Sequence, residues 1–344
     1  MKKHHWYPLL AAAVMFVCMS ATAVADSRAT MVDAIQKNDS VSRFSPLFPN
    51  ALYWQHAHDS TVLAETLVAT VHDEQNANEP PASFSRLQSE LLNNDVVALY
   101  GKPGARNMGI LGQYTIEEIE PVMDEFVRAY DEANGIRGVI PAVYIIYGTV
   151  WPEGEIGLTR EAVIQEYIEF AHERGWYVFI DHQIGRYSVE NAVQTLLPWL
   201  KYPNVHLAID PEWRTDKPMQ EIGYVTGDEL NMAQQMIQDY IVENNLPGRR
   251  MLVFHQFKPK MIANRNAVRS DFERVKLIHC ADGFGNPGQK INAYRFNALA
   301  ENIPLKSFKL FLKPTIEKAG WDQPLMSPEE VLSLDPRPYL IMYQ

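Results

Sequence analysis

Eight short apolar runs, each paired with a segment of helical patterning, recur along residues 83–344 of this chain. Continuous apolar runs between helices are typical of parallel strands buried on both faces. The runs occupy residues 96–101, 139–148, 176–181, 205–210, 251–257, 275–282, 308–314 and 339–343. The helices are predicted at residues 83–92, 115–133, 159–174, 188–200, 227–244, 260–272, 290–302 and 327–334. This rhythm predicts an α/β fold of the (β/α)8 TIM-barrel type, and a doubly wound open sheet is the alternative.

The outer ring of this predicted barrel has one irregularity. No helix follows the eighth run, whereas helix 83–92 precedes the first. We expect this early helix to replace the missing last one on the outside of the barrel.

The N-terminus carries the parts of a cleavable secretory signal. Lys2 and Lys3 precede an apolar stretch at residues 9–17, and residues 23–25 read Ala-Val-Ala. We predict a signal peptide at residues 1–25, with an uncleaved anchor as the alternative. Residues 26–82 are polar, end in a linker-like run at 76–81, and are predicted to pack as an extension on the barrel domain of residues 83–344. The mature protein is therefore predicted to be soluble, exported to the periplasm or beyond, and without a membrane span.

Charge and cysteine content narrow the classes of partner. The chain holds 31 Lys and Arg against 42 Asp and Glu, for a formal net charge of −11. An acidic chain is poorly suited to nucleic acid or anionic membranes, whereas a neutral or cationic substrate is compatible with it. Cleavage after residue 25 would remove Cys18 and leave Cys280 as the one cysteine, so an internal disulfide is excluded.

Polar residues gather at the ends of the apolar runs, where parallel barrels carry their active sites. Asp181 and Asp210 close two successive runs, and Glu212 leaves an extended chain on the same face as Asp210. If these strands are neighbours, the three carboxylates meet. The residues predicted to bind substrate around them are Tyr100, His182, Gln183, Trp213, Arg214, His255, Gln256 and Asp282.

Paired carboxylates suit the hydrolysis of a glycosidic bond. One carboxylic acid protonates the leaving oxygen, and a second, ionised carboxylate attacks or activates water. When two carboxyl groups lie close together, their pKa values separate, so that one group stays protonated while the other is ionised. We assign Glu212 as the acid because its side chain reaches further, with Asp210 or Asp181 as base or nucleophile. In the alternative structural interpretation, Asp210 pairs with Arg214 or caps the following loop, and Asp181 is held by Arg186.

Aromatic residues at or beyond the run ends also favour a sugar, because flat rings stack on the apolar face of a pyranose. They are Tyr100, Tyr144, Tyr147, Trp151, Trp213, Phe257, Phe284 and Trp321. The alternative is that about half of them close the barrel mouth, above all Tyr144 and Phe257.

His255 and Gln256 are expected on opposite faces of their strand, so only one of them faces the barrel. Asp282 lies in a glycine-rich turn, which its carboxylate could equally stabilise.

No cofactor is predicted. The sequence lacks an H-E-x-x-H motif, paired-cysteine zinc spacing, a G-x-S-x-G elbow, a Walker loop and a G-x-G-x-x-G loop after a strand. A divalent cation is the open alternative. It would be held by Asp181, Asp210, Glu212, His255 and Asp282, because oxygen-rich ligand sets suit Mg, Mn or Ca.

Four segments carry a resemblance to other proteins: residues 179–186 (FIDHQIGR), 208–214 (AIDPEWR), 252–257 (LVFHQF) and 281–285 (ADGFG). They resemble a group of exported bacterial proteins that are uncharacterised, and this resemblance implies no activity. More distantly, the predicted architecture is similar to barrel glycoside hydrolases. The chitinase-type signature D-x-x-D-x-D-x-E does not match, because the fourth run ends in D-P-E alone.

These observations favour an exported hydrolase that cleaves a glycosidic bond in a polysaccharide or cell-envelope glycan. A metal-dependent, phosphodiesterase-like hydrolase using the same pocket is the second hypothesis. A carbohydrate-binding barrel without catalysis is the third. In each case the predicted partner is a carbohydrate or another neutral polymer rather than nucleic acid.

Overall fold

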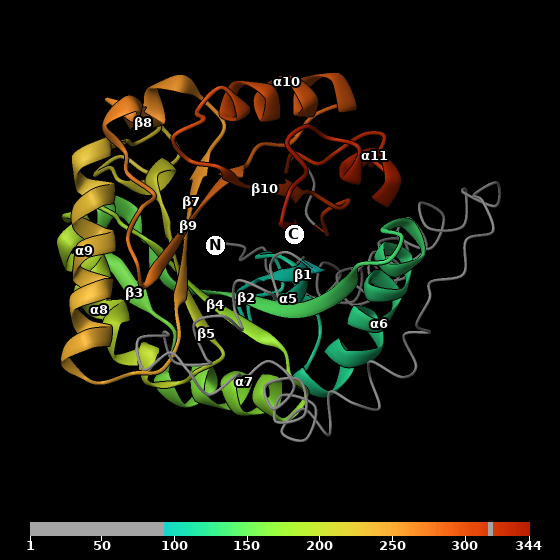
Figure 1. Cartoon of the computed structure of the whole chain (residues 1–344), viewed down its shortest axis with the longest axis horizontal. Coiled ribbons are helices and arrows are strands. Elements are labelled where there is room, and N and C mark those ends of the chain that lie inside the picture. Colours follow the sequence, from blue (N-terminus) through green and yellow to red (C-terminus); the bar gives the residue numbers. More distant parts are fainter. Residues whose placement is uncertain (1–92, 316–318) are drawn as a thin grey trace, which may run out of the picture.

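The computed structural model describes residues 93–315 and 319–344, in which eight parallel strands close into a barrel (Figure 1). The ring closes because β1 pairs with both β2 and β11. In their order around the barrel, the strands are β1 (Asn94–Gly101), β2 (Gly138–Val150), β4 (Tyr177–Gln183), β5 (Val205–Asp210), β7 (Arg250–Gln256), β9 (Val275–Ala281), β10 (Leu305–Leu310) and β11 (Leu340–Tyr343). This confirms the predicted TIM-type barrel. A short strand, β3 (Ile156–Leu158), folds back antiparallel on the end of β2.

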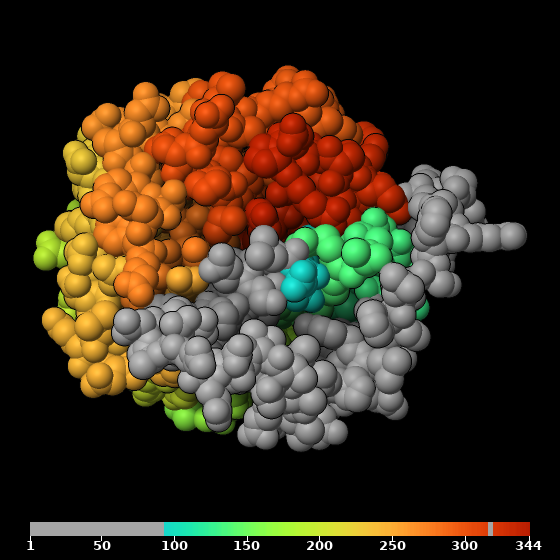
Figure 2. Space-filling view, viewed as in Figure 1, coloured from blue at the N-terminus to red at the C-terminus, as the bar shows by residue number. Residues whose placement is uncertain are grey.

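Helices surround the strands, and successive segments follow one another around the molecule in the space-filling view (Figures 1 and 2). The helices are α5 (Ile110–Gln113), α6 (Ile116–Ala133), α7 (Glu161–Glu173), α8 (Val189–Leu196), α9 (Gly227–Glu243), α10 (Pro287–Ala298) and α11 (Pro328–Leu332). Capping boxes fix several helix starts, because a cap side chain and the residue at N3 satisfy each other's backbone N–H groups. Thr115 with Glu118 and Thr226 with Glu229 both form this arrangement, as their spacing predicts.

The helix predicted at residues 260–272 is wrong. This connection instead holds two short 3-10 turns (Pro259–Met261 and Arg265–Ala267) and β8 (Ile262–Ala263), which pairs with β6 (Val225–Thr226). Two local features oppose a continuous helix there. Pro259 opens the first turn, and Asn264 adopts a left-handed backbone with φ of 53°. The seventh strand also begins earlier than predicted, at Leu305, and ends at Leu310.

The strands are buried on both faces, which gives the molecule two apolar layers. The inner layer fills the barrel and includes Val96, Tyr100, Phe179, Val253 and Met342. The outer layer lies between the strands and the helices. Side chains alternate along a strand, so residues two apart point to the same face. A polar residue that lies two positions from an inner-layer residue therefore also points into the barrel.

Several predictions concern residues outside the described ranges. They are the signal peptide at 1–25, the extension at 26–82 and the replacement helix at 83–92. Within residues 93–315 and 319–344, none of the helices combines the length and the apolar character that crossing a membrane requires.

Candidate active site

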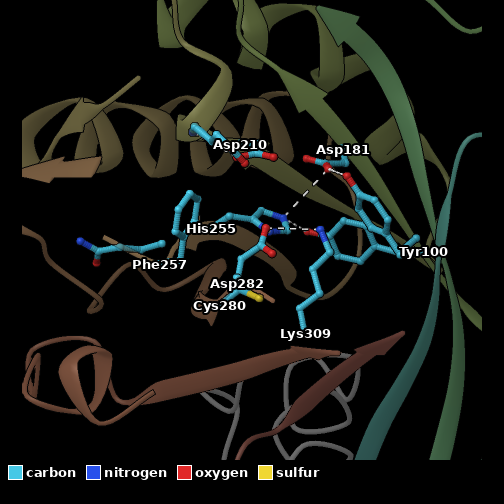
Figure 3. Close-up of polar contacts among 12 residues, drawn as sticks. Tyr100, Asp181, Asp210, His255, Phe257, Cys280, Asp282 and Lys309 are labelled. Atoms are coloured by element: carbon cyan, nitrogen blue, oxygen red, sulfur yellow. Dashed lines mark hydrogen bonds and ion pairs between the residues drawn. The ribbon is translucent and has the colours of Figure 1, made fainter. Parts of the chain in front are cut away.

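Polar side chains at the carboxyl ends of β1, β4, β5, β7, β9 and β10 meet inside the barrel, and Figure 3 shows those of Tyr100, Asp181, Asp210, His255, Asp282 and Lys309. Asp181, Asp210, His255 and Asp282 each lie two residues beyond an inner-layer residue, so the alternation turns them inward. Lys309 pairs in register with the inward-facing Met342 of β11. We call the following seven residues the mouth cluster: Tyr100, Asp181, Asp210, Glu212, His255, Asp282 and Lys309.

Asp181 has one engaged carboxylate oxygen and one free one. The Tyr100 hydroxyl donates to Asp181 Oδ2 at 3.0 Å. Asp181 Oδ1 is fully buried and has no hydrogen-bond partner among the described residues. A buried oxygen without a partner costs about 1–3 kcal/mol. Asp181 is therefore suited either to carry a proton or to accept a hydrogen bond from a ligand.

His255 links two parts of the cluster. Its Nδ1 lies 2.9 Å from Asp282 Oδ2, and its Nε2 lies 2.9 Å from the Tyr144 hydroxyl. Burial lowers the pKa of His255, but the hydrogen bond to Asp282 and the negative charges nearby outweigh it and raise the pKa well above its usual value. His255 is accordingly cationic at neutral pH, so both of its ring nitrogens donate.

Lys309 is a member of the mouth cluster that the sequence pattern did not predict. Its Nζ lies 3.3 Å from Asp282 Oδ2 and 3.9 Å from the centre of the Tyr100 ring. Burial lowers the pKa of Lys309, yet the charges of Asp282 and Asp210 reverse this effect and raise it. The lysine is therefore a permanent buried cation within the mouth cluster.

The cluster separates the pKa values of its four carboxyl groups. Burial, followed by the charge of Asp210, raises the pKa of Glu212 to about 8. Burial also raises the pKa of Asp210 to about 7 and raises that of Asp181. Burial acts in the same direction on Asp282, but Lys309 and His255 outweigh it and hold the Asp282 pKa below its usual value. Near pH 7 the site therefore contains both a protonated and an ionised carboxyl group.

A second buried ion pair positions the backbone below this cluster. Lys290 Nζ lies 3.2 Å from Asp322 Oδ2 and donates to the carbonyl oxygens of Gly283 and Lys309. Asp322 in turn accepts the backbone N–H groups of Gly285 and Phe311. These contacts fix the segments that carry Asp282 and Lys309.

The structure contradicts both ion pairs of the structural alternative, but it confirms that Asp210 caps the turn that follows it. Arg214 pairs with Glu229 at 2.7 Å rather than with Asp210, and Arg186 pairs with Glu155 rather than with Asp181. Asp210 Oδ1 instead accepts the backbone N–H of its neighbour Glu212 at 3.1 Å.

Five residues predicted to bind substrate do not join the mouth cluster, and four of them, His182, Gln183, Arg214 and Gln256, are engaged by other groups. Gln256 points outward, where its Oε1 lies 2.8 Å from His279 Nε2. His182 also points outward, against Gly148, and burial lowers its pKa to about 4. Gln183 Oε1 accepts the backbone N–H of Val150 at 2.7 Å.

Arg214 is the fourth, because it is held by Glu229. Trp213 lies half-buried on the short turn after Asp210, and its carbonyl oxygen accepts the Gly185 N–H. Of the residues predicted to bind substrate, Tyr100, His255 and Asp282 are the ones that the fold brings to the acids.

Three members of the cluster meet a geometric requirement for a metal site. Asp210, His255 and Asp282 each offer one ligand atom, and these atoms lie within 4.8 Å of one another. The donor set fits a cation poorly, however. Both nitrogens of His255 are engaged, and the Lys309 ammonium lies 3.3 Å from Asp282. A metal would have to displace these contacts.

A pocket lies at the same end of the barrel, beside the mouth cluster. It is lined by residues of α5 and of the segments that follow β1 and β10, including Arg106, Phe311, Lys313 and Gly320. None of the four clustered carboxyl groups lines it.

Comparisons with known proteins identify no family. No protein-family model and no curated protein matches the chain, so the resemblance to exported bacterial proteins stays a prediction. Among solved structures, the chain is similar to oxaloacetate acetylhydrolase in complex with oxalate, at 12% identity and a TM-score of 0.46 over 77% of this chain and 81% of that one. It is also similar to the xylanase and α-amylase inhibitor of Scadoxus multiflorus, at 12% identity and a TM-score of 0.42 over 72% and 92% of the two chains. A group IV chitinase of Ostrinia furnacalis matches at 12% identity and a TM-score of 0.39 over 63% and 66%. These are distant likenesses of fold.

Proposed function

We propose that this protein hydrolyses a glycosidic bond with Glu212 as general acid. The separation of pKa values within the mouth cluster carries the proposal. Glu212 keeps its proton to about pH 8, while Asp210 is ionised above about pH 7. A protonated and an ionised carboxyl group side by side are what this reaction requires.

The remaining residues have distinct roles in this proposal. Glu212 protonates the leaving oxygen, and Asp210 activates water or attacks the anomeric carbon. Asp181 addresses a substrate hydroxyl through its unpartnered Oδ1. His255 and Lys309 keep Asp282 ionised. The ionised Asp210 carboxylate stabilises the positive, oxocarbenium-like transition state.

The direct test is a panel of purified polysaccharides, including peptidoglycan, incubated with the protein. New reducing ends are counted and the products are separated by size. We expect cleavage of a neutral or cationic glycan, in keeping with the net charge of −11.

We also propose export to the periplasm or beyond. N-terminal sequencing of the protein recovered from cells tests this proposal, because cleavage of the signal would leave a chain that starts at Asp26.

The pH dependence of hydrolysis is a second test. Activity requires the base to be ionised and the acid to be protonated, so the rate falls below the lower pKa and above the higher one. We expect a narrow, bell-shaped dependence of the rate on pH that falls below about pH 7 and above about pH 8. The interacting pair Asp210 and Glu212 sets these two values. A kcat/KM profile from pH 4 to 10 measures it. A flat profile across this range would contradict the assignment.

The metal-dependent alternative predicts the opposite response to chelators. Because Lys309 and His255 already supply two cations beside Asp282, we expect activity to survive exhaustive dialysis against EDTA. The measurement is the rate before dialysis, after it, and after addition of Mg²⁺, Mn²⁺ or Ca²⁺. Loss of at least tenfold, restored by one of these ions, would favour the metal-dependent hydrolase.

A further inference from the structure

The exposed aromatic side chains of this protein gather at one end of the barrel. Among the residues that the structure describes, four are exposed: Trp151 (58%), Tyr187 (36%), Tyr224 (54%) and Phe284 (60%). Each lies in a segment that follows the carboxyl end of a barrel strand, namely β2, β4, β5 and β9. Exposed aromatic rings on the face that also holds the mouth cluster indicate a binding surface.

Two of these rings lie against glycines. A Cβ atom added to Gly157 would lie 2.1 Å from the Trp151 Nε1, and one added to Gly320 would lie 2.1 Å from the Phe284 ring. The absence of a side chain on each glycine therefore lets the ring lie close to the backbone while more than half of its surface stays exposed. Backing of this kind holds an exposed ring in one orientation, which lowers the entropic cost of binding.

The two backed rings follow strands on opposite sides of the barrel. β2, which precedes Trp151, and β9, which precedes Phe284, are four strands apart in either direction around the eight-stranded ring. Strands spaced about 4.8 Å apart and tilted by about 36° close into a barrel about 15 Å across. The mouth cluster lies between them, on the inward faces of the strands.

We infer that Trp151 and Phe284 are outer sugar-binding subsites on either side of the cleavage site. We call them the ring platforms. The inference rests on the proposed glycosidase function and extends it: one monosaccharide cannot reach both platforms, so the substrate is a polysaccharide that crosses the mouth and is cleaved internally. Stacked nucleobases would use similar rings, but the net charge of −11 opposes a polyanion.

Binding and turnover are measured separately, so that this inference and the proposed function can fail independently. Affinity is read from retardation in native gels cast with soluble glucan, xylan, mannan or chitosan, and from co-sedimentation with chitin or peptidoglycan. Turnover is read on the same polymers and on short aryl glycosides. The variants are Trp151→Ala, Phe284→Ala and their combination, together with Gly157→Ala and Gly320→Ala, which move each ring without deleting it. Ile136→Ala and Leu299→Ala are the controls, because both side chains are exposed in the turns that lead into strands at the other end of the barrel.

We expect each ring substitution to weaken polymer affinity by about 3- to 10-fold, and the pair by about 10- to 100-fold, because distant sites add. The glycine variants should also weaken polymer affinity. Turnover of short aryl glycosides should stay unchanged in all of these variants, and the two control variants should keep wild-type affinity and turnover. Early products of the wild type should be long oligosaccharides. Unchanged polymer affinity in the double variant, release of single terminal sugars, or no polymer binding by the wild type would overturn the inference. Ring-dependent binding by a protein that cleaves nothing would support the platforms while overturning the proposed catalysis.

Discussion

Replacing Glu212 by Gln is expected to lower kcat on the cleaved glycan by about 10²- to 10⁴-fold. The amide has nearly the same shape as the acid but holds no proton that it can give to a leaving oxygen. Among residues 93–315 and 319–344, no side-chain hydrogen bond is made by the half-buried Glu212 carboxyl that the substitution would break, so the fold should tolerate it. The measurement compares initial rates of wild type and variant on the same substrate, together with far-UV circular dichroism and polymer affinity, both of which should stay unchanged.

Glu221→Gln is the matched control, since Glu221 follows the same strand but is exposed and pairs with Lys217. We expect it to retain wild-type turnover. Full activity in Glu212→Gln would show that another group donates the proton. A wild type that binds glycan tightly without turnover, and whose binding the substitution leaves intact, would instead support a non-catalytic carbohydrate-binding barrel.

The fold was predictable because its strands are apolar on both faces. Each run of Val, Ile, Leu and aromatic residues between helical segments corresponds to one strand of the barrel, with ends shifted by a few residues. The connection after β7 was not predictable in the same way. Its course depends on the left-handed Asn264 and on the pairing of Ile262 with Val225, a contact with a residue distant in the chain.

Burial of the strands on both faces also limited how much of the candidate site could be predicted. Polar residues that end a strand stand out, so Asp181, Asp210 and His255 were found. Apolar neighbours surround both faces of such a strand, so the pattern does not reveal which face looks inward. The alternation predicts that only one of His255 and Gln256 faces the barrel, and the structure turns His255 inward and Gln256 outward. Lys309 was missed because its neighbours Phe308 and Leu310 belong to an ordinary apolar run, and the charges that it neutralises come from strands far away in the sequence.

Replacing Lys309 by Met is expected to lower the free energy of unfolding by about 3–5 kcal/mol near pH 7, the usual cost of removing one partner from a buried ion pair. The variant leaves Asp282 buried, with His255 as the cation that still contacts it and with Lys290 nearby. The measurement is urea or guanidinium unfolding followed by tryptophan fluorescence. At about 2–4 °C per kcal/mol, the loss should also be plain in thermal melts. Lys260→Met, which alters an exposed lysine, should leave stability nearly unchanged.

Two further measurements show whether Lys309 stabilises the barrel by its charge or by its packing. They are the pH dependence of this loss of stability and its response to a second substitution. In the wild type the Asp282 pKa is lowered, so its contribution to stability is present above the unfolded pKa and is lost as the pH falls. Without Lys309 the Asp282 pKa rises, and protonation relieves the buried charge in acid. The stability difference between wild type and Lys309→Met should therefore shrink from pH 7 toward pH 4. Adding Asp282→Asn should recover most of the loss at pH 7, because it removes the carboxylate that Lys309 neutralises. A difference that is the same at every pH, or no recovery in the double variant, would mean that Lys309 stabilises the barrel by packing and that the mouth cluster does not depend on its charge.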